Sequence, residues 1–312
     1  MCGIVGLLVK NQKMRANIGE LMLPMLIGMT ERGPDSAGLA IFGKAVSDDA
    51  RKFSLYTAEL DFNWQKLFDD FLTQAIKKNS GKDSGKDSVS KADNFTQKAN
   101  HAVLTTHLEP ASVKTWLKAD YPQVHLLSVG QLMDTYKDVG TPAQVAQRYG
   151  FEQMSGSHLV GHTRMATESA VTPAHAHPFT AGQDWCLVHN GSLSNAHNLR
   201  RKLNREGIDF ETDNDTEAAC RYLEWRMREG DDLKTALEHG FDALDGFYTL
   251  LMGTKDQLAL VRDPFACKPA IVAEHDDYVA IASEFRSLAH LPDIKHAKVF
   301  EPAPKEMYVW KV

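Results

Sequence analysis

The sequence predicts an α+β protein in which sheets pack on each other and helices cover their outer faces. Many short apolar segments have the length of strands, and a few longer segments have apolar residues at helical spacing. The chain has 312 residues, of which 43% are hydrophobic and 24% charged, as is usual for a globular enzyme with a sizeable core.

Helices are predicted where apolar residues recur every three or four positions. In residues 17–31, Ile18, Met22 and Met25 have this spacing, and the segment Arg32-Gly33-Pro34-Asp35-Ser36 interrupts the pattern. Further helices are expected at residues 61–78, 142–149, 196–206, 216–228 and 233–244.

Strands are predicted where short apolar runs lie between turn residues. The first, residues 2–9 (CGIVGLLV), is apolar almost throughout and should be buried on both faces. Residues 80–94 repeat the tetrapeptide GKDS without apolar periodicity and predict a surface loop. Further strands are expected at residues 37–42, 102–106, 124–129, 157–164, 247–252, 257–261, 270–272, 278–282 and 307–310.

Composition argues against several functional classes. Net charge is −6 with both signs mixed along the chain, so neither nucleic acid nor an anionic membrane is an expected partner. The longest apolar run, residues 21–29, is too short to span a bilayer. The four cysteines form no CxxC pair, and no dinucleotide or phosphate-loop motif occurs. We therefore expect a reduced, cytoplasmic protein without a metal or cofactor.

Cys2 is a candidate nucleophile because removal of Met1 would make it the N-terminal residue. Its thiol and a free α-amino group of pKa about 7.7–8.0 would then belong to one residue, so a base stands beside the nucleophile. If Met1 is retained, the nitrogen is a peptide nitrogen, and we expect an inactive protein. By itself, a cysteine at this position is usually just a small residue without a catalytic role.

The stretch Val188-His189-Asn190-Gly191 offers donors for an oxyanion. It is predicted to be a strand that ends in Asn-Gly, where a side-chain amide and an unhindered backbone N–H lie side by side. The alternative is an ordinary turn, since Asn-Gly is a common turn pair.

Two charged residues could hold the ends of an amino-acid substrate. Arg164, at the end of a strand, could bind a carboxylate through two parallel hydrogen bonds, although a surface salt bridge is the simpler role. Asp215, at the start of a helix, could bind an ammonium group or serve as the helix N-cap, and the two roles are compatible.

The pair His175 and His177 resembles metal ligands at first sight. They are two positions apart on a proline-flanked segment with no cysteine or carboxylate cluster nearby, so zinc is not expected. We expect them to order a loop through hydrogen bonds.

The order of these motifs along the chain resembles the class II glutamine amidotransferases. The resemblance rests on MCGIVG at the start, RGPDS at 32–36, GHTR at 161–164, His177-Pro178, His189-Asn190-Gly191 and Asp215-Thr216-Glu217. Residues 262–265 (RDPF) and 282–284 (ASE) resemble the late strands of that family. The resemblance implies the N-terminal-nucleophile (Ntn) hydrolase fold, a four-layer α/β/β/α sandwich of two mainly antiparallel sheets. Residues 2–312 would form this single domain.

The resemblance also implies a role for each matching residue. Cys2 would attack the side-chain amide of glutamine, and Asn190 and Gly191 would form the oxyanion hole. Arg164 would hold the α-carboxylate and Asp215 the α-ammonium group. Three further residues would support the site: Arg32 at the Cys2 segment, and Thr167 and His177 at the pocket.

The chain departs from the family pattern at two places. The span between RGPDS and GHTR is much longer than in compact members, which implies an insertion at about residues 45–156 that could cap the site or dock a partner. The family's late Arg-Asp-Pro-x-Gly loop has Ala266 in place of its glycine, which puts the shape of this loop in question.

No synthase motif accompanies the amidotransferase motifs. We therefore expect a stand-alone glutaminase subunit in a hetero-oligomer, whose ammonia goes to a separate synthase subunit of the glutamate synthase or N-methylglutamate synthase kind. Two alternatives remain: a partner-independent γ-glutamyl amidohydrolase, and a non-catalytic subunit that senses glutamine.

Overall fold

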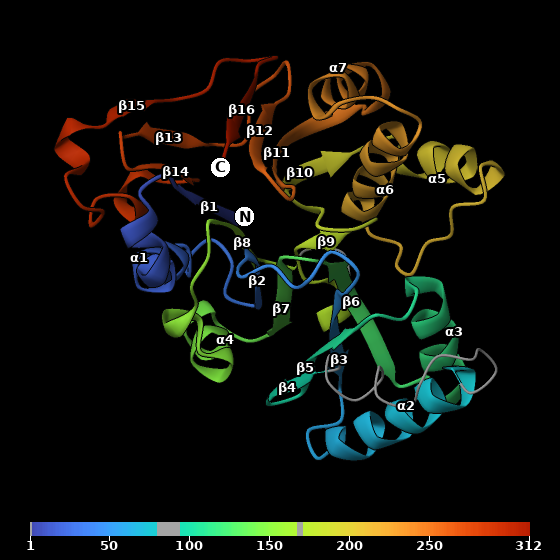
Figure 1. The fold of residues 1–312 in the computed structure, drawn as a ribbon. Helices are drawn as coiled ribbons and strands as arrows, with labels where there is room; N and C mark the ends of the chain where they lie inside the picture. The colour runs from blue at the N-terminus through green and yellow to red at the C-terminus, as the bar shows by residue number, and fades with distance from the viewer. Residues whose placement is uncertain (1, 80–93, 167–170) are drawn as a thin grey trace.

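The computed structural model describes residues 2–79, 94–166 and 171–312, the side chains of 75–79 excepted (Figure 1). Its centre is a seven-stranded sheet in which every pairing is antiparallel. The strands follow in the order β15 (Lys298–Phe300), β13 (Ile271–Glu274), β14 (Tyr278–Ala282), β1 (Gly3–Val9), β8 (His158–Arg164), β2 (Ser36–Phe42) and β7 (Met133–Val139).

A second, five-stranded antiparallel sheet packs against the first. Its order is β16 (Met307–Lys311), β12 (Gln257–Arg262), β11 (Gly246–Gly253), β10 (Cys186–Leu193) and β9 (Phe179–Thr180). The core between the sheets includes Ile4 and Leu8 of β1 and Val188 of β10. Val5 and Leu7 lie in the core on the opposite face of the first sheet. Burial of both faces explains why β1 is apolar throughout.

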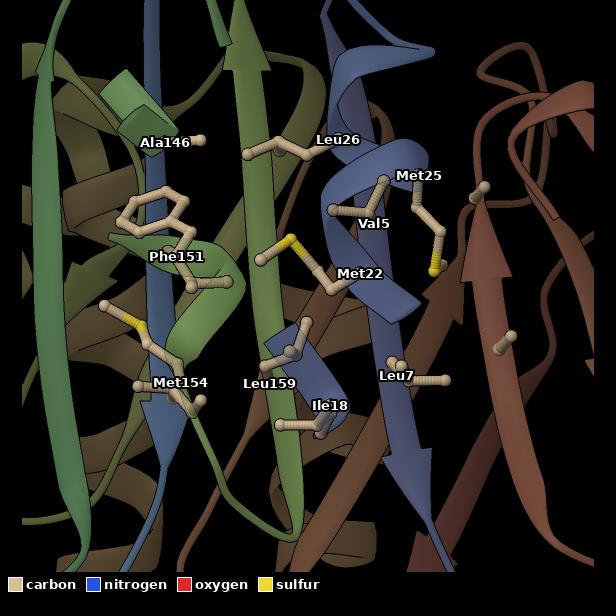
Figure 2. Close-up of a cluster of buried hydrophobic side chains, with 14 of the residues drawn as sticks. Val5, Leu7, Ile18, Met22, Met25, Leu26, Ala146, Phe151, Met154 and Leu159 are labelled. Carbon is tan, nitrogen blue, oxygen red and sulfur yellow. The ribbon is translucent and has the colours of Figure 1, made fainter. Parts of the chain in front are cut away.

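Helices cover the outer faces of both sheets. On the seven-stranded sheet, Met22, Met25 and Leu26 of α1 (Ile18–Ile27) pack toward Val5 and Leu7 of β1 (Figure 2). The helix α4 (Pro142–Tyr149) joins the same core. Three helices cover the five-stranded sheet: α5 (Ala196–Arg205), α6 (Asp215–Arg228) and α7 (Leu233–Ala243). The predicted α/β/β/α sandwich is therefore confirmed.

A third sheet lies beside the sandwich. It has the order β4 (Asn94–Lys98), β5 (His101–Thr106), β3 (Arg51–Thr57) and β6 (Val124–Gly130). The helices α2 (Trp64–Asn79) and α3 (Pro110–Asp120) bury Trp64 and Trp116 against it in a separate core. The strand β7 and the helix α4 also fall within residues 45–156, yet they belong to the main sandwich. The insertion itself stays a prediction.

The sequence did not predict β3, β4, β7, β9, β15 or α3. In β3 and β7, buried polar residues interrupt the apolar pattern, and some of them have partners within the fold. Lys52 pairs with Asp134 at 3.2 Å, and the Ser54 hydroxyl accepts a hydrogen bond from the Thr135 N–H at 3.0 Å. The predicted GKDS loop lies outside the described residues, except Asn94, which begins β4.

Short 3₁₀ helices occur at Gln12–Asn17, Phe151–Gln153, Pro173–His175, Phe285–Ser287 and Ile294–His296. Within the described residues, no helix combines the length and the apolar character that crossing a bilayer requires.

Candidate active site

Strand register brings Cys2 and Arg164 to the same end of the space between the sheets. Gly3 pairs with Thr163 in the antiparallel β1–β8 ladder, so one further step sets Cys2 opposite Arg164. Side chains alternate between the faces of a strand. Ile4 of β1 and Val160 of β8 both lie in the core between the sheets, so Cys2 and Arg164 share that face. The Arg164 side chain is buried, which excludes a surface salt bridge.

The carbonyl oxygen of Cys2 is held by two side chains. Arg32 Nε donates to it at 3.0 Å, and Asn190 Nδ2 donates to it at 3.2 Å. Arg32 is itself buried, and its Nη1 pairs with Glu284 Oε1 at 3.0 Å. The backbone of Cys2 is therefore held in place by the side chains of Arg32 and Asn190.

Asn190 and Gly191 lie inside a strand. They pair with Thr249 and Tyr248 of β11, and β10 continues to Leu193. The turn interpretation is therefore wrong, and so is the prediction that the strand ends at Asn-Gly, because β11 extends the pairing past both residues. Gly191 has φ +150°, and a Cβ there would lie 2.0 Å from the Phe247 carbonyl oxygen. Only glycine fits this position without a backbone shift.

The Thr216 hydroxyl connects three polar groups beside β10. It donates to Asp215 Oδ1 at 3.3 Å and lies 2.9 Å from His177 Nε2 and 3.0 Å from His189 Nδ1. A hydroxyl has one proton, so both imidazole nitrogens must donate to it. This arrangement assigns the tautomers: His177 carries its proton on Nε2 and His189 carries one on Nδ1.

His162 extends this cluster toward β8. Its Nε2 donates to the His189 carbonyl at 3.1 Å, and its ring stacks on His177 with centroids 4.1 Å apart. Burial lowers the pKa of His162 to about 3 and the pKa of His177 well below its ordinary value. Both rings are therefore neutral at physiological pH and act as fixed dipoles.

Asp215 is ionised at neutral pH. Burial alone would raise its pKa, but contact with His189 and the N–H of Leu193, which donates to Oδ2 at 2.9 Å, lower the pKa to about 2. The N-cap role predicted as an alternative belongs instead to Asn214, whose side chain accepts from the Thr216 N–H at 2.9 Å. The Asp215 carboxylate is thus not used as the cap.

His175 and His177 order their loop through different partners. His175 bonds Thr172 and Asp213, each at 2.7 Å, whereas His177 bonds Thr216, as the loop interpretation predicted. In the part of the chain that the structure describes, no three His, Cys, Asp or Glu side chains are placed to hold a metal ion.

Thr167 lies outside the described residues. Sequence reasoning gave no role to His162, Thr216 or Glu284, although all three fall inside motifs it quoted. Their position inside these motifs was the signal that could have identified them as site residues.

Comparisons with known proteins agree with this arrangement. Residues 162–290 match a family model described as a glutamine amidotransferase domain. The chain is 47% identical over 311 residues to the glutamine amidotransferase-like protein GlxB of Rhizobium meliloti (strain 1021), covering 99% of this chain and 98% of that protein. It is 34% identical over 151 residues to an amidophosphoribosyltransferase of Archaeoglobus fulgidus, covering 47% of this chain and 33% of that protein.

A solved structure shares the fold. The glutamine phosphoribosylpyrophosphate amidotransferase from B. subtilis, complexed with ADP and GMP, superimposes with a TM-score of 0.59 at 18% identity. The match covers 99% of this chain and 47% of that one. The sandwich is therefore the Ntn-hydrolase fold.

Proposed function

Since the chain belongs to the class II glutamine amidotransferases and is an enzyme of that class, we propose that it releases ammonia from glutamine through a Cys2 thioester. The observation that carries this proposal is the 3.2 Å hydrogen bond from the Asn190 amide to the Cys2 carbonyl. It sets an oxyanion donor directly against the residue that carries the nucleophile.

In the proposed reaction, Cys2 Sγ attacks the side-chain carbonyl carbon of glutamine. The α-amino group of Cys2, freed by removal of Met1, takes the thiol proton. The side-chain N–H of Asn190 and the backbone N–H of Gly191 stabilise the oxyanion. The carbon–nitrogen bond then breaks, the leaving nitrogen takes the proton, and ammonia departs. Water hydrolyses the γ-glutamyl thioester to glutamate and regenerates the thiol.

Arg164 and Asp215 are proposed to bind the two charged ends of glutamine. Arg164, opposite Cys2 in the strand register, would hold the α-carboxylate. Asp215, ionised at neutral pH, would hold the α-ammonium group. Thr167 and His177 would line or order the pocket, and Arg32 would position Cys2 through its carbonyl.

We further propose that the ammonia passes to a separate synthase subunit, glutamate synthase-like or N-methylglutamate synthase-like, in a cytoplasmic hetero-oligomer. The match to nearly the full length of a glutamine amidotransferase-like relative supports a separate subunit. Residues 2–312 would form one domain, and the third sheet would be the inserted part that caps the site or docks the partner.

The test is glutamate release from glutamine by purified protein, with intact mass to establish whether Met1 is present. We expect activity from Met1-free protein, no activity from Cys2→Ala, and wild-type activity from Cys267→Ala, which removes an exposed free thiol elsewhere. Activity in Cys2→Ala would contradict the thioester mechanism. Steady glutamine hydrolysis by protein that retains Met1 would contradict the N-terminal mechanism, in which the free α-amino group of Cys2 is the base.

If processed protein is silent, lysate from its source distinguishes the remaining cases. Rescue of glutamate release would support a partner-gated subunit. Continued silence with glutamine, together with hydrolysis of other γ-glutamyl compounds, would favour a partner-independent γ-glutamyl amidohydrolase. A protein that hydrolyses neither glutamine nor any other γ-glutamyl compound would favour the glutamine-sensing subunit.

A further inference from the structure

A cavity of about 370 Å³ lies where the third sheet meets the five-stranded sheet and α6. It is lined by residues of β3, β6, β7, α3, β9 and α6 and by residues 172–174. Figure 1 shows where these elements lie in the fold. This volume is within the range of small-molecule sites, about 300–1,000 Å³. None of the proposed catalytic or glutamine-binding residues within the described ranges lines it.

Lys137 supplies a buried positive charge to this cavity. Its side chain is 6% exposed, and Nζ donates to the Ala176 carbonyl at 2.8 Å and lies 4.7 Å from the centre of the Phe179 ring. Across residues 2–79, 94–166 and 171–312, no carboxylate forms an ion pair with it. A buried ammonium group without a counterion is costly, and burial lowers its pKa to about 8. An anion in the cavity would remove this cost.

The other charged groups of the wall include two carboxylates that favour the charged form of Lys137 without pairing with it, and they leave a formal excess of one positive charge. Lys114 of α3 and Arg221 of α6 add two cations, against the carboxylates of Glu211 and Glu217, so the formal balance is +1. The Glu217 carboxylate is already used: it accepts from the N–H groups of Glu211 and Thr212 and pairs with Arg221 at 2.8 Å.

Ser128 provides an unsatisfied hydrogen-bonding group in the same wall. It is 3% exposed, and its hydroxyl has no hydrogen-bond partner among the described residues. The β3–β6 register shifts between Ser54 and Leu55, which leaves Leu127 unpaired as a bulge. Leu126, Leu127 and Ser128, at this bulge, all line the cavity. Bulges commonly re-aim side chains beside functional sites.

We propose that this cavity binds a small organic anion, with its carboxylate or phosphate group held by Lys137 and Ser128. Its apolar body packs on Phe179, Pro173 and Val129, which also line the wall. Lys114, at the α3 side, contributes charge without being buried. The site is separate from glutamine binding, and its test does not depend on the proposed reaction.

The experiment is calorimetric titration of the full chain with benzoate, phenyl phosphate and benzamide. Benzamide has nearly the shape of benzoate without its charge, and the two anions distinguish a carboxylate from a phosphate ligand. The variants are Lys137→Met, Ser128→Ala and Lys114→Gln, with Lys118→Gln as the matched control. Lys118 is exposed one turn further along α3 and does not line the cavity.

We expect one of the anions to bind with one-to-one stoichiometry and benzamide to bind at least tenfold more weakly. Lys137→Met should weaken anion binding at least tenfold, Ser128→Ala and Lys114→Gln severalfold, and Lys118→Gln not at all. The proposal is overturned if neither anion binds, if benzamide binds equally well, or if Lys114→Gln and Ser128→Ala bind as wild type does. If Lys137→Met fails to fold, Lys114→Gln and Ser128→Ala still decide the test.

Discussion

Asn190 Nδ2 lies 3.2 Å from the carbonyl oxygen of Cys2, across the space between the two sheets. A primary amide has two N–H donors, so this bond leaves a second donor for the oxyanion. The same oxygen also accepts from Arg32. The amide is therefore oriented before substrate arrives, which is the condition under which such donors contribute most.

Asn190→Ala should lower kcat for glutamine hydrolysis by about 10²- to 10³-fold, the usual effect of removing one oxyanion donor. The KM for glutamine should change little, because the donor acts mainly in the transition state. Steady-state glutamate release measures both. Asn204→Ala, at an exposed position of α5, is the control. A kcat within a few-fold of wild type in Asn190→Ala would exclude the oxyanion role.

Thr216→Val should raise the KM for glutamine and lower the free energy of unfolding by about 1–3 kcal/mol. The valine has nearly the same shape, but it leaves the polar atoms of His177, His189 and Asp215 without their shared partner. Thr216→Ser keeps the hydroxyl and should restore most of both properties. Urea unfolding and glutaminase assays measure them. Equal behaviour of the valine and serine variants would show that the hydroxyl is not what orders this cluster.

The fold was largely predictable because strand and helix periodicity is strong along most of the sandwich. The apolar run of β1 predicted a strand buried on both faces, and the structure has it at the centre of a sheet. The strands β3 and β7 were not predictable. Their buried Lys52, Ser54 and Thr135 interrupt the apolar pattern, and the sequence does not show that Lys52 pairs with Asp134 or that Ser54 accepts from the Thr135 N–H.

The candidate site was predictable as a set of residue types but not as a network. Motif order pointed to Cys2, Asn190 and Asp215, yet nothing in the sequence indicates that Thr216 joins two histidines to Asp215. That connection depends on how α6 packs against β10. The N-cap was misjudged by one position for a similar reason, since Asn214 and Asp215 are both good capping residues.

His158→Gln should flatten the pH dependence of stability. Burial lowers the pKa of His158 to about 4 from an ordinary value of 6.5, so the folded state keeps the ring neutral while the unfolded chain takes up a proton. Its contribution to stability is therefore fully present above pH 6.5 and is lost as pH falls toward 4. Between pH 7.5 and 5.5 this loss is about 1.4 kcal/mol in wild type.

Urea unfolding of both proteins at pH 7.5 and 5.5 measures this difference. The gap in unfolding free energy between wild type and His158→Gln should narrow by about 1.4 kcal/mol on acidification. The exposed His197→Gln is the control and should leave the wild-type pH dependence unchanged. A gap that stays constant would mean that His158 does not remain neutral in the folded state.

Ala266→Gly should stabilise the protein. Ala266 has φ +50°, a left-handed conformation that favours glycine, and its carbonyl accepts from Arg262 Nη2 at 2.7 Å while its N–H faces Asp263. The loop therefore keeps the backbone shape that a glycine would adopt, although an alanine occupies it.

Relief of the left-handed strain, about 1–2 kcal/mol, should exceed the greater entropy of an unfolded glycine, about 0.5–1 kcal/mol. The expected net gain in urea unfolding is up to about 1.5 kcal/mol. Ala303→Gly, at an exposed position without a positive φ, should instead destabilise the protein. If Ala266→Gly destabilises it to the same extent, the loop does not hold this conformation in solution.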